Sequence, residues 1–319
     1  MMYRRLALVM LLPLLLTGAV AGHAATPPQA APAQDTPGWQ QVNTNGFGTP
    51  LATEVSAVEV FGAHLYAGTT NATDGARLYR SPDGTTWSPV SEPGFGIAHD
   101  IRPLGILDLT VYNGRLYAST GRTDNAAQIW RAQDGLTWAP MVITGFDDPD
   151  TVDITALIAY NGALYAGTHN LVKGAQVWRS YSGDNNTWTQ VAPAQPGSGP
   201  GQVTGFAVFD GALYAAVESD APAQIWRTYG GEWTTIVDDG FGSALTTATG
   251  SLTEFAGHLY VGAGNETGGA QLWRTADATA WEPASAPAFG DAHNERIEAV
   301  FVFQNQLYAS AKNTTTGLE

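Results

Sequence analysis

The chain repeats one pattern about every 48 residues, and this repeat limits its fold more than any other feature. A Leu-Tyr pair marks each copy, at successive spacings of 51, 48, 49, 46 and 48 residues. The pairs are Leu65-Tyr66, Leu116-Tyr117, Leu164-Tyr165, Leu213-Tyr214, Leu259-Tyr260 and Leu307-Tyr308. A Trp after a polar turn has the same period, at Trp39, Trp87, Trp138, Trp188, Trp233 and Trp281. Such a repeat predicts one supersecondary unit per copy, packed against its neighbours.

Each copy contains four short strand patterns, here called a to d, as the third copy illustrates. An apolar run at 154–160 is followed by the turn Asn161-Gly162, which favours a two-residue hairpin. The ALYAG segment at 163–167, the AQVWRS segment at 175–180 and a strand opening at Trp188 complete the unit. No copy holds a helical period long enough for a helical solenoid. Four strands per copy are typical of a β-propeller blade.

We therefore predict an all-β fold, a β-propeller of about six four-stranded blades. Residues 38–42 form strand d at the N-terminal end, and we expect this strand to pair with the last blade and close the ring. The last copy ends after strands a and b, so the last blade is incomplete in this chain. We expect the natural chain to continue beyond Glu319.

The chain divides into three parts. Residues 1–24 combine Arg4 and Arg5, an apolar run and small residues, which is typical of a secretory signal peptide. Residues 25–37 form an Ala/Pro/Gln-rich linker, and residues 38–319 form the propeller, with repeats near 49–90, 97–142, 151–191, 201–237, 245–284 and 296–319. The mature protein is thus expected to be secreted, periplasmic or on the cell surface, with no membrane span after signal cleavage.

Charge and composition exclude several classes of function. The formal net charge is −15, which disfavours nucleic acid as a partner. The absence of Cys excludes disulfides, thiolate metal sites and a cysteine nucleophile.

The turn between strands c and d carries a resemblance to a known family. Ser81-Pro-Asp83-Gly84-Thr-Thr-Trp87 is similar to the Asp-box of the bacterial-neuraminidase-repeat (BNR) propellers, and residues 132–138 are a second match. Later copies keep less of the pattern, such as Asp277 and Trp281 in the fifth. The chain thus resembles the sialidase-type, WD40/YVTN/BNR-like repeat superfamily. The resemblance implies the propeller fold, with the box on the face opposite the usual ligand site.

No catalytic constellation is recognisable in the sequence. A sialidase would need three converging arginines, but Arg80, Arg131, Arg179, Arg227 and Arg274 recur once per copy, which indicates a structural role. Other glycosidases need a pair of carboxylates at a set separation, which sequence does not reveal. We identify no cofactor. Asp147, Asp148, Asp150 and Asp153 are candidates for a Ca²⁺ site, and the alternative is a solvated acidic rim.

Two loops between strand d and the next strand a share an unusual string. Residues 95–102 and 289–296 both fit Phe-Gly-x-Ala-His-x-x-Arg. We predict that His99, Arg102, His293 and Arg296 bind one anionic or sugar-like ligand near the mouth of the channel. The alternative is inherited repeat sequence that caps the entrance of strand a.

These observations favour an exported, non-catalytic module that binds a glycan or protein through variable loops on one face. An extracytoplasmic carbohydrate-active hydrolase or lyase is one alternative. A structural repeat domain of a longer surface protein is the other.

Overall fold

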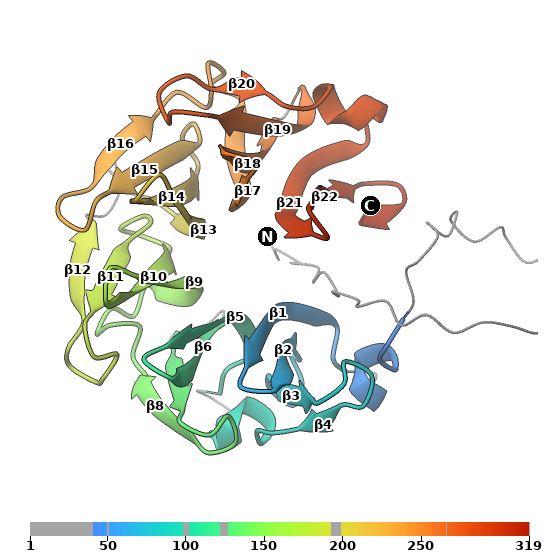
Figure 1. Ribbon diagram of the computed structural model, residues 1–319, viewed down its shortest axis with the longest axis vertical. Coiled ribbons are helices and arrows are strands. Elements are labelled where there is room, and N and C mark those ends of the chain that lie inside the picture. The colour runs from blue at the N-terminus through green and yellow to red at the C-terminus, as the bar shows by residue number, and fades with distance from the viewer. Residues whose placement is uncertain are drawn as a thin grey trace, which may run out of the picture.

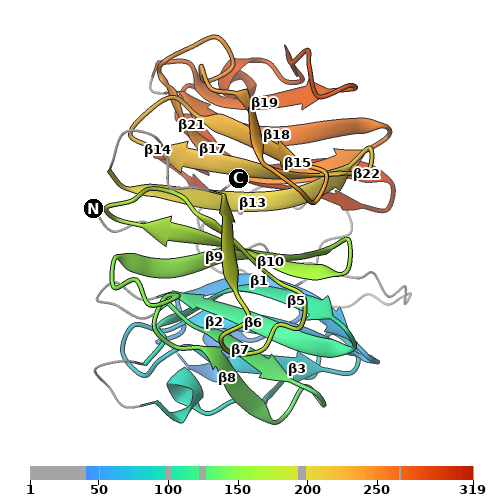
Figure 2. The ribbon, with the colours of Figure 1, turned by 90° about the vertical axis from the view of Figure 1, so that its left-hand side faces the viewer.

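The protein is an all-β repeat structure, as predicted. The computed structural model describes residues 41–49, 51–97, 102–121, 127–192, 199–265 and 267–318. The predicted signal peptide and linker lie outside these ranges. Antiparallel units follow one another in chain order around a common centre, with the first and last on either side of an opening (Figure 1). Figure 2 shows the same units from the side. Among the described residues there is no helix long and apolar enough to cross a membrane.

Within the described ranges, five units have four strands each, and the sixth has three. The first comprises β1 (Glu54–Phe61), β2 (His64–Thr70), β3 (Leu78–Ser81) and β4 (Ser88–Pro89). The second comprises β5 (Gly105–Tyr112), β6 (Arg115–Gly121), β7 (Ile129–Ala132) and β8 (Trp138–Val142). The third comprises β9 (Thr151–Tyr160), β10 (Ala163–Asn170), β11 (Val177–Ser180) and β12 (Thr189–Ala192). The fourth comprises β13 (Gly201–Phe209), β14 (Ala212–Ser219), β15 (Gln224–Thr228) and β16 (Thr234–Val237). The fifth comprises β17 (Thr246–Phe255), β18 (His258–Asn265), β19 (Gly269–Thr275) and β20 (Glu282–Pro283). The sixth comprises β21 (Asn294–Phe303), β22 (Gln306–Asn313) and β23 (Gly317–Leu318).

The two ends of the repeat differ from the prediction. The expected last unit lacked strand c, but the two-residue β23 pairs with β22 and begins that strand. Gln41 and Val42 were expected in a strand and lie outside any strand, while residues 38–40 fall outside the described ranges. The first four units form one 16-stranded sheet and the last two a 7-stranded sheet, so pairing of the described strands does not join the last unit to the first.

The turns between strands a and b form as their sequences predict. Asn113, Asn161 and Asp210 have φ values of 48°, 47° and 46°, and each is followed by a Gly that also has positive φ. Asn, Asp and Gly tolerate this conformation, which two-residue hairpins of this type require.

Side chains on strand a connect the inner strands of successive units. Asp108 Oδ2 accepts a hydrogen bond from the backbone N–H of Leu157 in the next unit, at 2.7 Å. The Thr155 hydroxyl donates to Val203 O, and Ser251 bonds with Val300 in the same way. Strand a has a register shift near these residues in all six units, as β-bulges produce. The bulges therefore place polar side chains of one blade within hydrogen-bond distance of the next blade.

The core consists of five clusters, and each joins two consecutive units. The repeated Tyr is central, because Tyr66, Tyr117, Tyr165 and Tyr214 are all fully buried. Tyr117 Oη donates a hydrogen bond to Ser182 O in the c–d turn of the next unit. Stacking of the units thus buries faces that a single sheet would leave exposed.

Short 3₁₀ turns before strand a add a second aromatic layer. They are η1 (Asn45–Gly48), η2 (Pro93–Gly96) and η3 (Pro287–Gly290). In η2, Phe95 has φ of 55° and stacks on Trp130 at 4.4 Å between ring centroids. Its edge meets Trp138, the lone Trp of the same unit. Similar contacts surround Phe47, Phe146 and Phe241.

The predicted Asp-box is present as a turn. Asp83 Oδ1 accepts hydrogen bonds from the backbone N–H groups of Thr85 and Thr86. Asp277 makes the equivalent bonds although its copy has lost the Gly, because Ala278 takes the positive φ of 58°. The third unit departs from this pattern, since Asp184 pairs with Arg131 of the second unit.

Candidate functional site

The loop end of the inner strands holds a set of equivalent positions. Ile106 pairs with the residue three after Tyr117, and Ile297 pairs with the residue three after Tyr308, so the two isoleucines are equivalent. We call the residue directly before this isoleucine on strand a the mouth position. It pairs with a residue on strand b. The six pairs are Glu54 with Thr70, Gly105 with Gly121, Asp153 with His169, Gln202 with Glu218, Ala248 with Gly264, and Arg296 with Lys312. The strand-a residue of these pairs differs in every unit, whereas the core residue after it is Val, Ile or Thr in all six.

Arg296 forms the charged centre of this end. Its Nε and Nη2 each donate a 2.9 Å hydrogen bond to Glu298, which gives a bidentate ion pair. Its Nη1 lies 3.3 Å from Glu218 Oε1, which belongs to the fourth unit, two blades away. The three side chains are only 17%, 12% and 12% exposed, for Arg296, Glu218 and Glu298 respectively. Burial would lower the pKa of Arg296, but its bonds to Glu298 and the nearby negative charges outweigh burial and raise this pKa.

Small residues in the fifth unit accommodate the Arg296 side chain. Gly264 pairs directly with Arg296 across the two units. A Cβ at Gly264 would lie 2.5 Å from Arg296 Cβ and 3.2 Å from Ala248 Cβ. A larger residue at position 264 would therefore displace the arginine that bridges the fourth and sixth units.

A second polar pair lies in the third unit. His169 Nδ1 is 2.9 Å from Asp153 Oδ2, and both side chains are largely covered. His169 also pairs with Gln202 of the fourth unit, and Gln202 pairs with Glu218. We call the resulting series the polar track, and it comprises Asp153, His169, Gln202, Glu218, Arg296 and Glu298.

The chemistry of the polar track is that of a hydrogen-bonding surface. Three carboxylates accompany one guanidinium and one imidazole, so the track is rich in acceptors. The Arg296 guanidinium is already bonded to two carboxylates, which leaves it poorly available to an anionic ligand.

Three of the four predicted ligand residues lie within the described ranges, and each has partners of its own. His99 lies outside the described residues. The mouth position held by Arg296 is held by Gly105 in the second unit, so Arg102 lies three residues too early to be its equivalent. Arg102 donates to Thr73 O of the first unit, and His293 lies 2.8 Å from Asp291. Of the three predicted residues that the structure describes, Arg296 alone belongs to the polar track.

Three of the four aspartates proposed for Ca²⁺ have separate side-chain partners. Asp147 accepts from Thr144, Asp148 pairs with Lys173 at 2.8 Å, and Asp153 pairs with His169. Asp148 Oδ1 also accepts from the backbone N–H of Asp150. In the described part of the chain, no three His, Asp or Glu side chains form a group that could hold a metal ion.

The asparagines of the b–c loops have a structural role that the sequence analysis missed. Asn170 is fully buried, accepts from two backbone N–H groups of its own loop, and donates to Asp148 and Thr151 of the d–a loop. Asn71, Asn265 and Asn313 organise their loops in the same way. The repeated string Asn-x-x-x-Gly, at 71–75, 170–174, 265–269 and 313–317, is the signal for this feature.

Comparisons with solved structures agree with the architecture. A Trypanosoma rangeli sialidase in complex with 2,3-difluorosialic acid has a TM-score of 0.53 and 12% identity, covering 84% of this chain and 53% of that one. The same enzyme with the inhibitor DANA has a TM-score of 0.52 and 13% identity, covering 82% of this chain and 53% of that one. A Bacillus subtilis arabinanase is also similar, with a TM-score of 0.43 and 13% identity over 67% of this chain and 91% of that one. No family model and no curated protein matches the sequence.

The fold is similar to that of these sialidase structures. The chain spans about half the length of the sialidase structures that it resembles. At this level of identity the likeness concerns the fold alone.

The repeated arginines of this propeller lie at the end away from the polar track. Arg131 pairs with Asp184, and Arg179 donates to Gly230 O, so both reach the c–d turn of the following blade. Arg274 pairs with Glu282 on the adjacent strand d. These contacts agree with the structural role that their repetition indicated.

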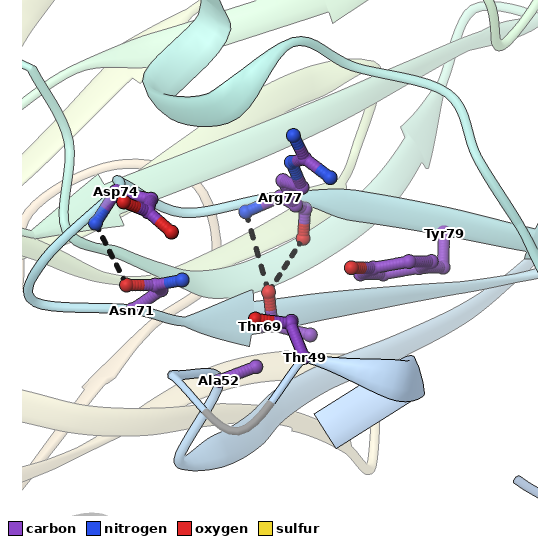
Figure 3. Close-up of a pocket in the computed structure, with 7 residues that line it drawn as sticks. All are labelled: Thr49, Ala52, Thr69, Asn71, Asp74, Arg77 and Tyr79. Atoms are coloured by element: carbon purple, nitrogen blue, oxygen red, sulfur yellow. Dashed lines mark hydrogen bonds between the residues drawn. The ribbon is translucent and has the colours of Figure 1, made fainter. Parts of the chain in front are cut away.

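A small hollow lies in the first blade, where Arg77 and Tyr79 replace the Gln and Trp of strand c (Figure 3). In the second to fourth blades that Gln accepts a hydrogen bond from the Trp indole. The hollow measures about 50 Å³ and is lined by Thr49, Ala52, Thr69, Asn71, Asp74, Arg77 and Tyr79. This volume admits a few water molecules and is too small for a sugar ring.

Proposed function

We propose that this protein is a six-bladed propeller that binds an uncharged glycan at the mouth of its channel without catalysing a reaction. The observation that carries the proposal is the polar track, which joins three blades and occupies positions that differ in every unit while the frame repeats. Variable residues on a repeated frame are how repeat proteins form recognition surfaces. The likeness of the fold to a sialidase that binds a sugar derivative agrees with a carbohydrate ligand.

The electrostatics favour a neutral ligand. Glu218 and Glu298 together outnumber the positive charge of Arg296, which they already engage. An anionic sugar would meet excess negative charge, while hydroxyl groups would find carboxylate and amide acceptors.

The same pairing favours binding over hydrolysis. A glycosidase needs one carboxyl group that donates a proton and a second that acts as base or nucleophile. Glu218 and Glu298 both bond to the Arg296 guanidinium, so neither carboxyl group is free to act on a bound sugar by itself. A hydrolase remains the second candidate, because the 2.9 Å contact of His169 with Asp153 places an acid–base pair in the track.

The partial exposure of the first and last units supports the proposal that the six blades form a closed ring. The Leu of the Leu-Tyr pair is fully buried in the four inner units, but Leu65 and Leu307 are only partly buried. Pairing of residues 38–42 with the sixth unit would cover these edges, as in closed propellers. The predicted signal peptide supports export of the closed domain.

A glycan array of the mature protein, with and without Ca²⁺, tests the proposal. We expect binding to neutral glycans that the substitutions Glu218→Gln and His169→Ala weaken. Glu282→Gln is the matched control, because Glu282 is 61% exposed on outer strand β20 and lies outside the track. Exclusive binding of sialylated glycans, or release of sugar from any of them, would contradict the proposal.

A further inference from the structure

Two tyrosines stand out on the face that carries the c–d turns. Tyr181 and Tyr229 follow β11 and β15 at the same position of the third and fourth blades. They are 64% and 63% exposed, and they are the two exposed tyrosines among the described residues. The equivalent residues in the first, second and fifth blades are Pro82, Gln133 and Ala276. These tyrosines are therefore not required by the blade.

The repeated arginines hold the two rings in place. Arg179 Cζ lies 5.1 Å from the centre of the Tyr181 ring, and Arg227 Cζ lies 5.5 Å from that of Tyr229. Both distances are within the range of a cation–π contact. Arg179 also donates a 2.9 Å hydrogen bond to Gly230 O, directly after Tyr229, so one guanidinium connects the two tyrosines.

The backbone beneath the rings is anchored as well. Tyr112 Oη lies 2.7 Å from both Tyr181 O and Gly162 O, so its single hydroxyl proton is donated to one of these carbonyl oxygens or shared between them. The rings are thus exposed but restricted in motion. A side chain ordered before binding loses less conformational entropy when a ligand arrives.

We propose that Tyr181 and Tyr229 form a stacking platform for the pyranose rings of an uncharged polysaccharide. A flat aromatic face suits the flat C–H face of a β-linked glucose or xylose unit, and two neighbouring platforms suit a linear chain. The adjacent residues are small or polar, namely Ser182, Gly183, Gly230 and Gly231. They provide no continuous apolar patch of the kind that a protein partner needs.

Two guanidinium groups near the platform are already engaged by the protein. Arg131 is paired with Asp184, and Arg179 is bonded to a backbone carbonyl. The platform lies at the opposite end of the blades from the polar track, so it is a second site that does not depend on the first.

Retention of the mature protein on microcrystalline cellulose, insoluble xylan and chitin tests the platform. We expect retention on at least one of them. The double variant Tyr181→Ala/Tyr229→Ala should bind about tenfold more weakly or worse, because two stacking contacts are lost. Tyr181→Phe/Tyr229→Phe should stay near the wild-type affinity, because it keeps both rings.

Two controls keep the outcome interpretable. Leu136→Ala removes another exposed apolar side chain from a c–d turn and should change nothing. Glu218→Gln in the polar track should leave retention intact, so the platform and the proposed mouth site can fail separately. Urea unfolding shows whether each variant is folded. The platform is refuted if wild-type protein is not retained, if a folded Ala variant binds normally, or if the Phe variant binds as weakly as the Ala variant.

Discussion

Gly114 and Gly135 have the same backbone conformation in different surroundings, which allows a direct test of how blades pack. Both have φ of 69°. Nothing lies within 4 Å of a Cβ built at Gly114, in a hairpin turn. A Cβ at Gly135, in the Asp-box turn, would overlap Tyr66 Oη of the preceding blade and lie 2.7 Å from its Cζ.

The expected magnitudes follow from these surroundings. Positive φ costs an L-residue ~1–2 kcal/mol, and Ala recovers ~0.4–1 kcal/mol by restricting the unfolded chain. Gly114→Ala should therefore lower the free energy of unfolding by about 1 kcal/mol. At Gly135 the buried Tyr66 must also move, which adds ~1–3 kcal/mol of overpacking, for a total of about 2–4 kcal/mol.

Urea unfolding followed by Trp fluorescence measures the difference, provided that the variants share one m-value. In a Tyr66→Phe background the cost of Gly135→Ala should shrink, because the atom nearest to the new methyl group is gone. Equal losses for Gly114→Ala and Gly135→Ala, or no relief in that background, would show that the Tyr does not pack against the turn as described.

Three further outcomes are expected. Asp83 and Asp277 have pKa values held below the ordinary range by backbone N–H groups, so their contribution to stability is complete above the unfolded-state pKa of ~3.9 and is lost as pH falls below it. A double Asp→Asn variant should lose less stability than wild type between pH 5 and pH 2 in urea titrations. Asn170→Ala should cost ~2–3 kcal/mol of unfolding free energy, because it leaves buried donors and acceptors without partners. Gly264→Val should displace Arg296 and weaken glycan binding in the array assay, and unchanged binding would remove Arg296 from the site.

The frame could be predicted from the sequence because it depends on local and repeated signals. Turn dipeptides such as Asn161-Gly162 specify three of the hairpins, and a Tyr recurs at the same place in all six units. The decayed box at Asp277 still forms its turn, since two backbone hydrogen bonds need only the carboxylate and a residue that accepts positive φ.

The site could be predicted only in part, because it depends on long-range contacts and on register. Arg296 and Glu218 are 78 residues apart in sequence and meet only when three blades stack. The string shared by the loops before Arg102 and Arg296 suggested equivalence, but the strand pairing places the two arginines three residues out of step. A string match in a loop does not specify register, whereas counting from the repeated Tyr does.

Counting from the repeated Tyr also shows which positions belong to the repeated frame and which to the polar track. A core residue such as Ile297 must fit against the Gly262 backbone of the preceding blade, which constrains its size. Ile106 against Gly68 and Val203 against Gly167 are constrained in the same way. The residue before each of these, at the mouth position, is not restricted to one size and ranges from Gly105 to Arg296. Function at this end therefore requires a departure from the repeat, and so does the platform of Tyr181 at the other end. In a propeller of this kind, the positions where one blade differs from its neighbours are the ones to test for ligand binding.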